Sequence, residues 1–207
     1  SQDYDVILTT ASLSLRLAMI APQLKAATIG WQHNCYDGYL HVKPVVFWQQ
    51  ENLLQQYLPN LDRYIVLSDY DKRDYMEKLG IDCEVKINPR SFVSEKKCDV
   101  KSKRFLMATR FVYAKGLDLM MESFEEFCKE DSEWELDIIG DGDLFDQIRA
   151  DAKRRHLEKR VHFVGYTNEP EKYYLNSSVF LLPSRWEGWP MVIMEAFEFG
   201  LPVIAYH

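Results

Sequence analysis

Two glutamates near the end of the sequence have a spacing that suits the binding of hydroxyl groups. Glu187 and Glu195 have seven residues between them in EGWPMVIMEAFEFGLPVIA, residues 187–205. A carboxylate can accept hydrogen bonds from vicinal hydroxyls, and each bond to a charged group contributes about 1.5–3 kcal/mol. At different depths of one crevice, the two could hold two hydroxyl-bearing rings, a ribose and a second sugar. The alternative is that both face solvent.

The residues between the glutamates indicate a loop followed by a helix. Pro190 suits the first turn of a helix, because its missing N–H has no intrahelical partner there. Gly188 permits close approach of the backbone, and the N–H groups of Trp189 and Met191 are available to sugar or phosphate oxygens. Glu195 then lies about one and a half turns into the helix among apolar neighbours, where an unpartnered buried carboxylate is costly. A ligand would supply the partner.

A second candidate group is cationic. Arg110 and Lys115-Gly116 follow the apolar run RFLMAT and precede a predicted helix. Cations beside a helix N-terminus suit an anion such as a pyrophosphate, because the free N–H groups and the helix dipole act in the same direction. Taken alone, this spacing is more typical of solvated turn residues.

The segments around these residues predict an α/β domain over 103–207. Short apolar runs predict strands at 104–109, 134–140, 160–165, 179–184 and 202–205. Amphipathic stretches between them predict helices over about 117–128, 142–157 and 170–176, and one from Pro190 onward. Strands that alternate with helices form a parallel sheet with helices on both faces.

Residues 1–90 predict a second, partial domain of the same class. Strands are expected at 4–10, 27–34, 63–68 and 83–89, with an apolar helix after the first. The stretch 91–102 is rich in Lys and Ser and has neither helical nor strand periodicity, so we interpret it as a linker. Both domains are expected to be truncated.

Ligands of open parallel sheets bind beyond the carboxyl ends of the strands. Gly165-Tyr166 follows one predicted strand, where a glycine lets the backbone approach a flat ligand such as a base; an exposed turn is the equal alternative. Asp141-Gly142-Asp143 follows another, and we interpret it as a tight turn with a helix N-cap.

Composition excludes several classes of protein. The net charge of −7 over 207 residues is spread over both halves, so a clustered basic face for nucleic acid is not expected. No apolar run reaches the roughly 18–20 residues that cross a bilayer. The four cysteines lack metal-ligand spacing and predict reduced thiols in a cytoplasmic protein, with no metal site.

The stretch PSRWEGWPMVIMEAFEFGLPVIA (183–205) resembles the nucleotide-sugar site of retaining glycosyltransferases of the GT-B fold, group 1 type (family 4), whose hallmark is two glutamates with seven residues between them. The resemblance extends through ATRFVYAKGLDLMMESF, LDIIGDGDLFDQI and RVHFVGY, and so covers essentially all of 103–207. Residues 4–90 resemble the later part of the family's N-terminal domain. Two Rossmann-like parallel-sheet domains are therefore implied.

The resemblance implies a role for each candidate residue. Glu195 would bind the ribose hydroxyls of the donor, and Glu187 the hydroxyls of the donor sugar. Gly188, Trp189, Pro190 and Met191 would lie beside that sugar. Arg110 and Lys115 would stabilise the diphosphate leaving group.

Residues of both domains complete the implied site. Gly165 and Tyr166 would lie by the base. His33, in the motif WQHN, would lie across the cleft near the anomeric carbon. A lone histidine after a strand is otherwise more often structural.

The implied reaction transfers a hexose from a nucleotide-diphosphate sugar to a saccharide or lipid-linked acceptor, without a metal or other cofactor, in surface-polysaccharide or glycolipid synthesis. Retention would come from front-face attack. The protein would be cytoplasmic, with peripheral membrane association possible. The family's N-terminal glycine-rich loop is absent from the sequence, which is expected to be part of a longer enzyme.

Alternatives from other classes stay open. One is a non-catalytic nucleotide-sugar-binding subunit, and another is a GT-B-fold nucleotide-sugar epimerase. Trp31, Tyr36, Tyr39, Phe47 and Trp48 could line an acceptor or membrane-facing groove, although at helical spacing such residues are more often core.

Overall fold

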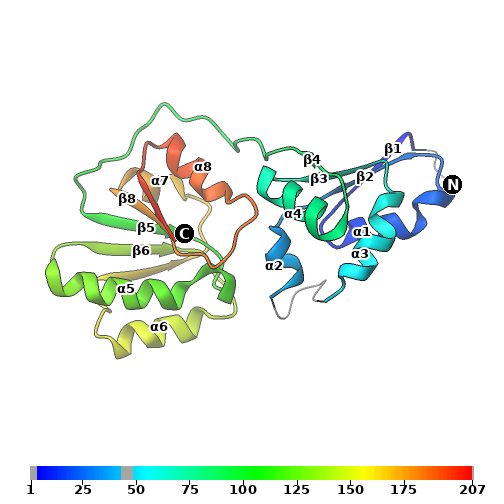
Figure 1. The fold of residues 1–207 in the computed structure, drawn as a ribbon. Helices are drawn as coiled ribbons and strands as arrows, with labels where there is room; N and C mark the ends of the chain where they lie inside the picture. The colour runs from blue at the N-terminus through cyan, green and yellow to red at the C-terminus, as the bar shows by residue number, and fades with distance from the viewer. Residues whose placement is uncertain (1–3, 43–48, 207) are drawn as a thin grey trace. The chain divides into compact units, whose positions relative to one another are not determined.

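The computed structural model describes residues 4–42 and 49–206, which form two compact units (Figure 1). One unit comprises Ser1–Pro89 with Trp186–Trp189, and the other Arg90–Arg185 with Pro190–His207. Each unit contains a parallel sheet, so the predicted α/β class with two parallel-sheet domains is confirmed.

The C-terminal unit contains a five-stranded parallel sheet of order β7-β6-β5-β8-β9. Its strands are β5 (Arg104–Ala108), β6 (Glu135–Ile139), β7 (Val161–Gly165), β8 (Val179–Leu182) and β9 (Val203–Ala205). The helices are α5 (Leu117–Glu130), α6 (Phe145–Arg154), α7 (Glu171–Leu175) and α8 (Met191–Glu198), with a 3-10 turn η3 (Tyr113–Lys115) before α5. Every predicted strand of this half is present, and so is every predicted helix. The helix α5 extends two residues beyond the predicted 117–128, whereas α6 and α7 are shorter than predicted and α8 begins one residue after Pro190.

The central strands of this sheet are buried on both faces, as the apolar runs predicted. Successive side chains of a strand point to opposite faces. Leu106 and Phe180 therefore join the core under α7 and α8, while Met107 and Leu181 join the core under α5 and α6. Figure 1 shows these two helix pairs on opposite sides of the sheet.

The N-terminal unit contains a four-stranded parallel sheet of order β1-β2-β3-β4. The strands are β1 (Val6–Thr10), β2 (Ala27–Trp31), β3 (Arg63–Val66) and β4 (Glu84–Val85). The helical segments are α1 (Leu13–Ile20), η1 (Ala21–Gln23), α2 (Tyr36–Leu40), α3 (Glu51–Tyr57), η2 (Leu58–Asn60) and α4 (Asp69–Leu79).

The fourth strand is much shorter than the predicted 83–89. Only Glu84 and Val85 pair with β3, opposite Ile65 and Val66. The β3 strand ends at Val66, whose carbonyl accepts one further hydrogen bond from the Lys86 N–H at 3.0 Å. Beyond this point the extended chain has no strand to pair with, so an apolar pattern alone overestimated its length.

The segment 91–102 contains no helix or strand and contacts the C-terminal end of α8. The Lys97 ammonium donates to the Glu198 carbonyl at 2.7 Å, and the Cys98 N–H donates to the Phe199 carbonyl at 2.8 Å. The Glu198 carboxylate accepts from the Ser94 N–H and from Arg90. These two donors lower the pKa of Glu198 below its ordinary value. The segment is therefore tied to the helix that carries Glu195.

Two glycines allow the loops at the carboxyl ends of the strands to approach one another. Gly140 has φ 126°, and a Cβ there would lie 1.8 Å from the Thr109 carbonyl oxygen. Gly116 has φ 63°, and its Cβ would lie 2.0 Å from the Pro183 carbonyl oxygen. Any larger residue would separate the loops that follow β5, β6 and β8.

We predict that Gly140→Ala lowers the free energy of unfolding by about 2–4 kcal/mol, because backbone strain and a backbone clash add. Gly165→Ala is the matched control, since Gly165 also has positive φ (79°) but has nothing within 4 Å of the added Cβ. It should cost about 1 kcal/mol. Urea unfolding of both variants measures the difference, and equal losses would contradict the close approach at Gly140.

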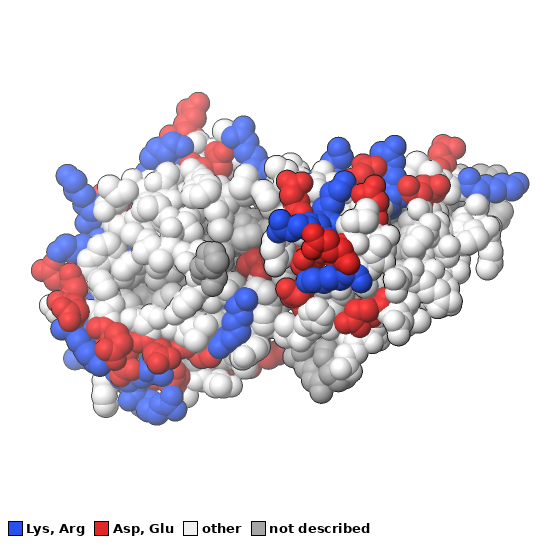
Figure 2. All heavy atoms as spheres, in the orientation of Figure 1, with Lys and Arg blue, Asp and Glu red and all other residues white. Residues whose placement is uncertain are grey.

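Charges of both signs are interspersed on the face of the molecule that Figure 2 shows. Figure 2 shows Lys and Arg mixed with Asp and Glu over α5 and α6, without a patch of one sign on the face shown. Within the described parts of the chain, no helix is both long and apolar enough to span a membrane.

Candidate functional site

The candidate site of the C-terminal unit lies where the strand order reverses. From β5 the chain proceeds outward to β6 and β7, and then returns to β8 on the other side of β5. Adjacent crossovers therefore leave the sheet in opposite directions between β5 and β8, which is the position where open α/β sheets bind ligands. Arg110 and Lys115 follow β5, and the two glutamates follow β8.

The cationic residues occupy the turn from β5 into α5. The Arg110 side chain is exposed and makes no ion pair with any described residue, whereas Lys115 is half-buried at the end of η3. Gly116, in the left-handed conformation, is the N-cap residue of α5. The Phe111 side chain is buried and holds the turn in place. The backbone N–H of Phe111 donates to the Asp141 carbonyl at 2.9 Å. The turn can thus present positive charge from a fixed backbone.

Arg185 connects this turn to the loop after β8. Its guanidinium makes two hydrogen bonds to the Asp118 carboxylate, at 2.8 and 2.5 Å, and a third to the Tyr113 carbonyl at 2.9 Å. It also lies over the Tyr113 ring, 4.0 Å from the centroid. The Arg185 N–H donates to the Ala114 carbonyl at 2.8 Å. The segment that ends in Lys115 is therefore held against the β8 loop.

Glu195 lies on α8, half-buried, with one defined partner. Its Oε2 accepts a hydrogen bond from the Tyr174 hydroxyl at 2.8 Å, and its Oε1 accepts none from the described residues. Pro190 precedes the first helical residue, Met191, rather than starting the helix as predicted. The Met191 N–H has no intrahelical acceptor, as expected for a first turn.

A cavity of about 1030 Å³, lined by both polar and apolar side chains, adjoins Glu195. Its volume is at the upper end of the range for small-molecule sites. The lining residues come from the 90–102 segment, the start of α7 and the inner face of α8: Phe92, Val93, Ser94, Glu95, Lys96, Asn168, Glu169, Pro170, Glu171, Lys172, Tyr174, Leu175, Glu195 and Phe199.

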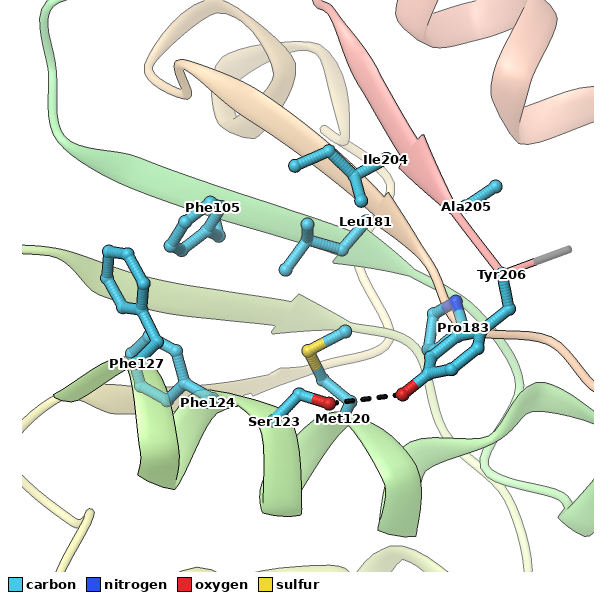
Figure 3. Close-up of a pocket in the computed structure, with 10 residues that line it drawn as sticks. All are labelled: Phe105, Met120, Ser123, Phe124, Phe127, Leu181, Pro183, Ile204, Ala205 and Tyr206. Atoms are coloured by element: carbon cyan, nitrogen blue, oxygen red, sulfur yellow. Dashed lines mark hydrogen bonds between the residues drawn. The ribbon is translucent and has the colours of Figure 1, made fainter. Parts of the chain in front are cut away.

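The other cavity near β8 has a different character. Its volume is about 310 Å³. Figure 3 shows its mainly aromatic and aliphatic lining, which comes from α5 and from the strands β5, β8 and β9. The Ser123 and Tyr206 hydroxyls on its wall bond to each other at 3.1 Å. This cavity therefore offers little to a phosphate or a sugar. The cavity beside Glu195, which has charged side chains in its lining, is the better candidate.

Other predicted site residues lie at neighbouring strand ends or in the N-terminal unit. Gly165 ends β7, and its carbonyl accepts from the Gly140 N–H at 2.9 Å, while Tyr166 is 79% exposed. The segment Trp186–Trp189, which contains half-buried Glu187 together with Gly188, groups with the N-terminal unit by its contacts.

His33 lies two residues beyond the end of β2 in the N-terminal unit. Its ring lies 5.1 Å from the Trp31 ring, centroid to centroid. Loss of solvent around the imidazole lowers the pKa of His33 below its ordinary value of 6.5, although the residue stays exposed. The lowered pKa favours the neutral form of the ring.

The aromatic residues considered for a groove divide between core and partly exposed positions. Tyr36 and Tyr39 are buried in the core of the N-terminal unit, and Trp31 is half-buried. Phe47 and Trp48 lie outside the described residues. Within the described chain, no group of three or more His, Cys, Asp or Glu side chains could hold a metal ion.

The family model for glycosyl transferases group 1 matches residues 91–207, more than half of the sequence. The chain therefore belongs to this family. An uncharacterized glycosyltransferase of Haemophilus influenzae is 30% identical over 148 residues, which are 70% of this chain and 42% of the relative. The amylovoran biosynthesis glycosyltransferase AmsD of Erwinia amylovora is 33% identical over 106 residues, 51% of this chain and 30% of AmsD.

The solved structures show the same fold. A mutant of S. aureus TarM, crystallised with fondaparinux, alpha-GlcNAc-glycerol and UDP, has a TM-score of 0.77 at 22% sequence identity, covering 87% of this chain and 37% of the TarM chain. The chain thus spans less than half the length of these relatives. Their GT-B architecture agrees with the fold class predicted from the sequence.

Sequence reasoning missed two residues of this arrangement. Tyr174, the partner of Glu195, is 21 positions away from it, and Arg185 is 67 positions from Asp118. Arg185 stands inside the motif that carried the resemblance, yet nothing in its spacing pointed to Asp118.

The bond between Asp118 and Arg185 leads to a pH-dependent prediction. The hydrogen bonds and charge of Arg185 lower the pKa of Asp118 below its ordinary value of 3.8. A lowered pKa contributes stability above pH 3.8 that is lost as the pH falls through the folded-state pKa. Asp118→Asn should therefore cost about 0.5–1 kcal/mol at neutral pH, a value kept small by the half-exposed carboxylate, and almost nothing well below pH 3.8.

Urea unfolding at the two pH values measures this difference. Glu126→Gln is the matched control on α5, because Glu126 pairs with Lys129 where both side chains are more than 60% exposed. It should change stability by less than about 0.3 kcal/mol at either pH. A cost of Asp118→Asn that does not vary with pH would contradict the assignment.

Proposed function

We propose that this protein is a retaining glycosyltransferase that moves a hexose from a nucleotide-diphosphate sugar to a saccharide or lipid-linked acceptor. The observation that carries the proposal is Glu195, a half-buried carboxylate whose Oε1 accepts no hydrogen bond from the described residues. It adjoins a large cavity and belongs to a sheet whose reversal point also carries Arg110 and Lys115. Family membership supports the reaction class. The name of AmsD supports a role in surface-polysaccharide synthesis.

The proposed roles follow from the chemistry of each group. Glu195 accepts hydrogen bonds from the ribose hydroxyls, and Glu187 accepts them from the transferred sugar. Arg110 and Lys115 stabilise the negative charge that develops on the diphosphate as the glycosidic bond breaks. The backbone of Gly188, Trp189, Pro190 and Met191 lies beside the sugar, Gly165 and Tyr166 beside the base, and neutral His33 near the anomeric carbon.

The proposed chemistry needs neither a protein nucleophile nor a metal ion. In a front-face attack the acceptor hydroxyl loses its proton to the leaving phosphate, while the new bond forms on the face from which the diphosphate departs. The complex of TarM with UDP supports a nucleoside-diphosphate donor. A cytoplasmic location, with or without peripheral binding to a membrane, fits such a donor.

The two glutamates should respond differently to substitution. We expect Glu195→Gln to weaken binding of the nucleoside diphosphate about tenfold, because it removes a charged acceptor from the ribose. Glu187→Gln should lower kcat about tenfold or more with little change in nucleotide affinity, since its contact is to the reacting sugar. Calorimetry gives the affinity, and transfer of labelled sugar gives kcat.

Glu126→Gln, on the exposed face of α5, serves as the control and should leave both quantities unchanged. Near-wild-type values for both site variants would overturn the assignment. Binding without transfer to any acceptor would favour a non-catalytic subunit. Release of an epimerised nucleotide sugar without an acceptor would favour an epimerase.

Removal of metal should not affect donor binding. We expect the dissociation constant of the nucleoside diphosphate to change by less than about twofold after dialysis against EDTA, because Arg110 and Lys115 supply the positive charge. Calorimetry before and after dialysis, and after Mg²⁺ is added back, measures this. A strict requirement for Mg²⁺ would contradict the proposed role of the two cations.

A further inference from the structure

Tyr174 is the described residue that bonds to the Glu195 side chain. It lies on α7 with only 1% of its surface exposed, and its hydroxyl donates to Glu195 Oε2 at 2.8 Å. Burial, followed by the nearby charge of Glu195, raises the pKa of Tyr174 far above its ordinary value of 10. The phenol therefore stays protonated at physiological pH and remains a hydrogen-bond donor.

The Tyr174 ring is fixed by packing that is independent of this hydrogen bond. It stacks on Phe180 of β8 at a centroid distance of 5.8 Å and an interplanar angle of 4°, and on Phe199 at 5.2 Å and 26°. Stacked aromatic pairs at such distances stabilise one another beyond the area they bury. The hydroxyl is therefore held in place by the core rather than by the carboxylate it contacts.

A rigid donor restricts a flexible acceptor. The glutamate side chain has three rotatable bonds, and ordering such a side chain costs conformational entropy. When Oε2 is held by Tyr174, the orientations open to the carboxylate are restricted before a ligand arrives, and Oε1 is left without a partner among the described residues. A preorganised acceptor binds more tightly, because less freedom is lost on binding.

We infer that Tyr174 is a positioning residue whose hydroxyl holds the Glu195 carboxylate in the orientation that accepts both ribose hydroxyls of the donor, and that it thereby sets the selection of ribonucleotides over 2′-deoxyribonucleotides. The inference rests on the proposed function, which makes Glu195 the ribose contact. Tyr174 itself need not touch the donor.

The selection follows from hydrogen-bond geometry. A site built to accept a substrate hydroxyl discriminates against the analogue that lacks it, since a buried acceptor is then left unpaired. Without the Tyr174 hydroxyl, the carboxylate can rotate toward whichever hydroxyl remains. Loss of the Tyr174 hydroxyl should therefore weaken binding of the ribonucleotide more than binding of the deoxyribonucleotide.

The test compares Tyr174→Phe with wild type in calorimetric titrations of the purified protein. UDP, GDP and ADP are titrated first, and the tightest binder is then compared with its 2′-deoxy form. We expect wild type to prefer the ribonucleotide about tenfold. In Tyr174→Phe the ribonucleotide should bind about five- to tenfold more weakly, and the preference should fall to about twofold or less. In transfer assays, KM for the donor should rise while kcat stays nearly unchanged.

Tyr173→Phe is the matched control, because it removes a phenol hydroxyl from the adjacent position of α7. The Tyr173 hydroxyl makes no hydrogen bond with the described residues, and the residue is half-buried. This variant should keep the wild-type affinity and preference. Phenylalanine at 174 retains the stacked ring, and thermal unfolding checks that both variants are folded.

The outcomes separate this inference from the function on which it rests. If Glu195→Gln abolishes the ribose preference and Tyr174→Phe does not, the positioning role is wrong and the ribose contact stands. An equal loss of affinity for both nucleotides in Tyr174→Phe also overturns it, since that indicates a general structural effect. If wild type binds none of the three diphosphates, or if Glu195→Gln changes nothing, the proposed function fails as well.

Discussion

The pairing of β5 with both β6 and β8 determines where the loops of the candidate site lie in the C-terminal unit. Parallel strands joined by right-handed crossovers place helices on both faces, so a central strand must be apolar on both sides. Leu106 and Met107, adjacent in β5, meet this requirement by joining opposite cores. Because the chain leaves β5 in one direction and returns through β8 on the other side, their two loops end side by side.

The close approach of these loops depends on local features that stabilise one arrangement. Backbone carbonyl oxygens lie so close to Gly116 and Gly140 that no side chain would fit at either position. Arg185 then joins the β8 loop to the turn before α5 through its backbone N–H, its guanidinium and its position over the Tyr113 ring. A guanidinium suits this task because its planar donors match a carboxylate and its face stacks on an aromatic ring. Lys115 is positioned as a consequence.

The position of Glu195 depends on the core under α7 and α8. Tyr174, Phe180 and Phe199 form a stack beneath α8, and the only polar atom of that stack is the Tyr174 hydroxyl bonded to Glu195. The segment 90–102 is attached to the other end of α8 through Glu198. One short helix therefore connects the aromatic core, the proposed ribose contact and the segment that follows the N-terminal unit. The eight residues of α8 therefore contribute both to the packing of the core and to the proposed ligand contact.

The sequence by itself determined the α/β class, all five strands of the C-terminal sheet and the family, because apolar runs, helical periodicity and the spacing of Glu187 and Glu195 are local properties of the chain. It overestimated β4, since strand length depends on how far the neighbouring strand extends. It gave no sign of the Tyr174–Glu195 or Arg185–Asp118 bonds, whose partners are far apart in the chain. Only the tertiary structure decided those, because a hydrogen bond depends on positions within a few tenths of an ångström, which are set by the packing of elements and not by any one of them.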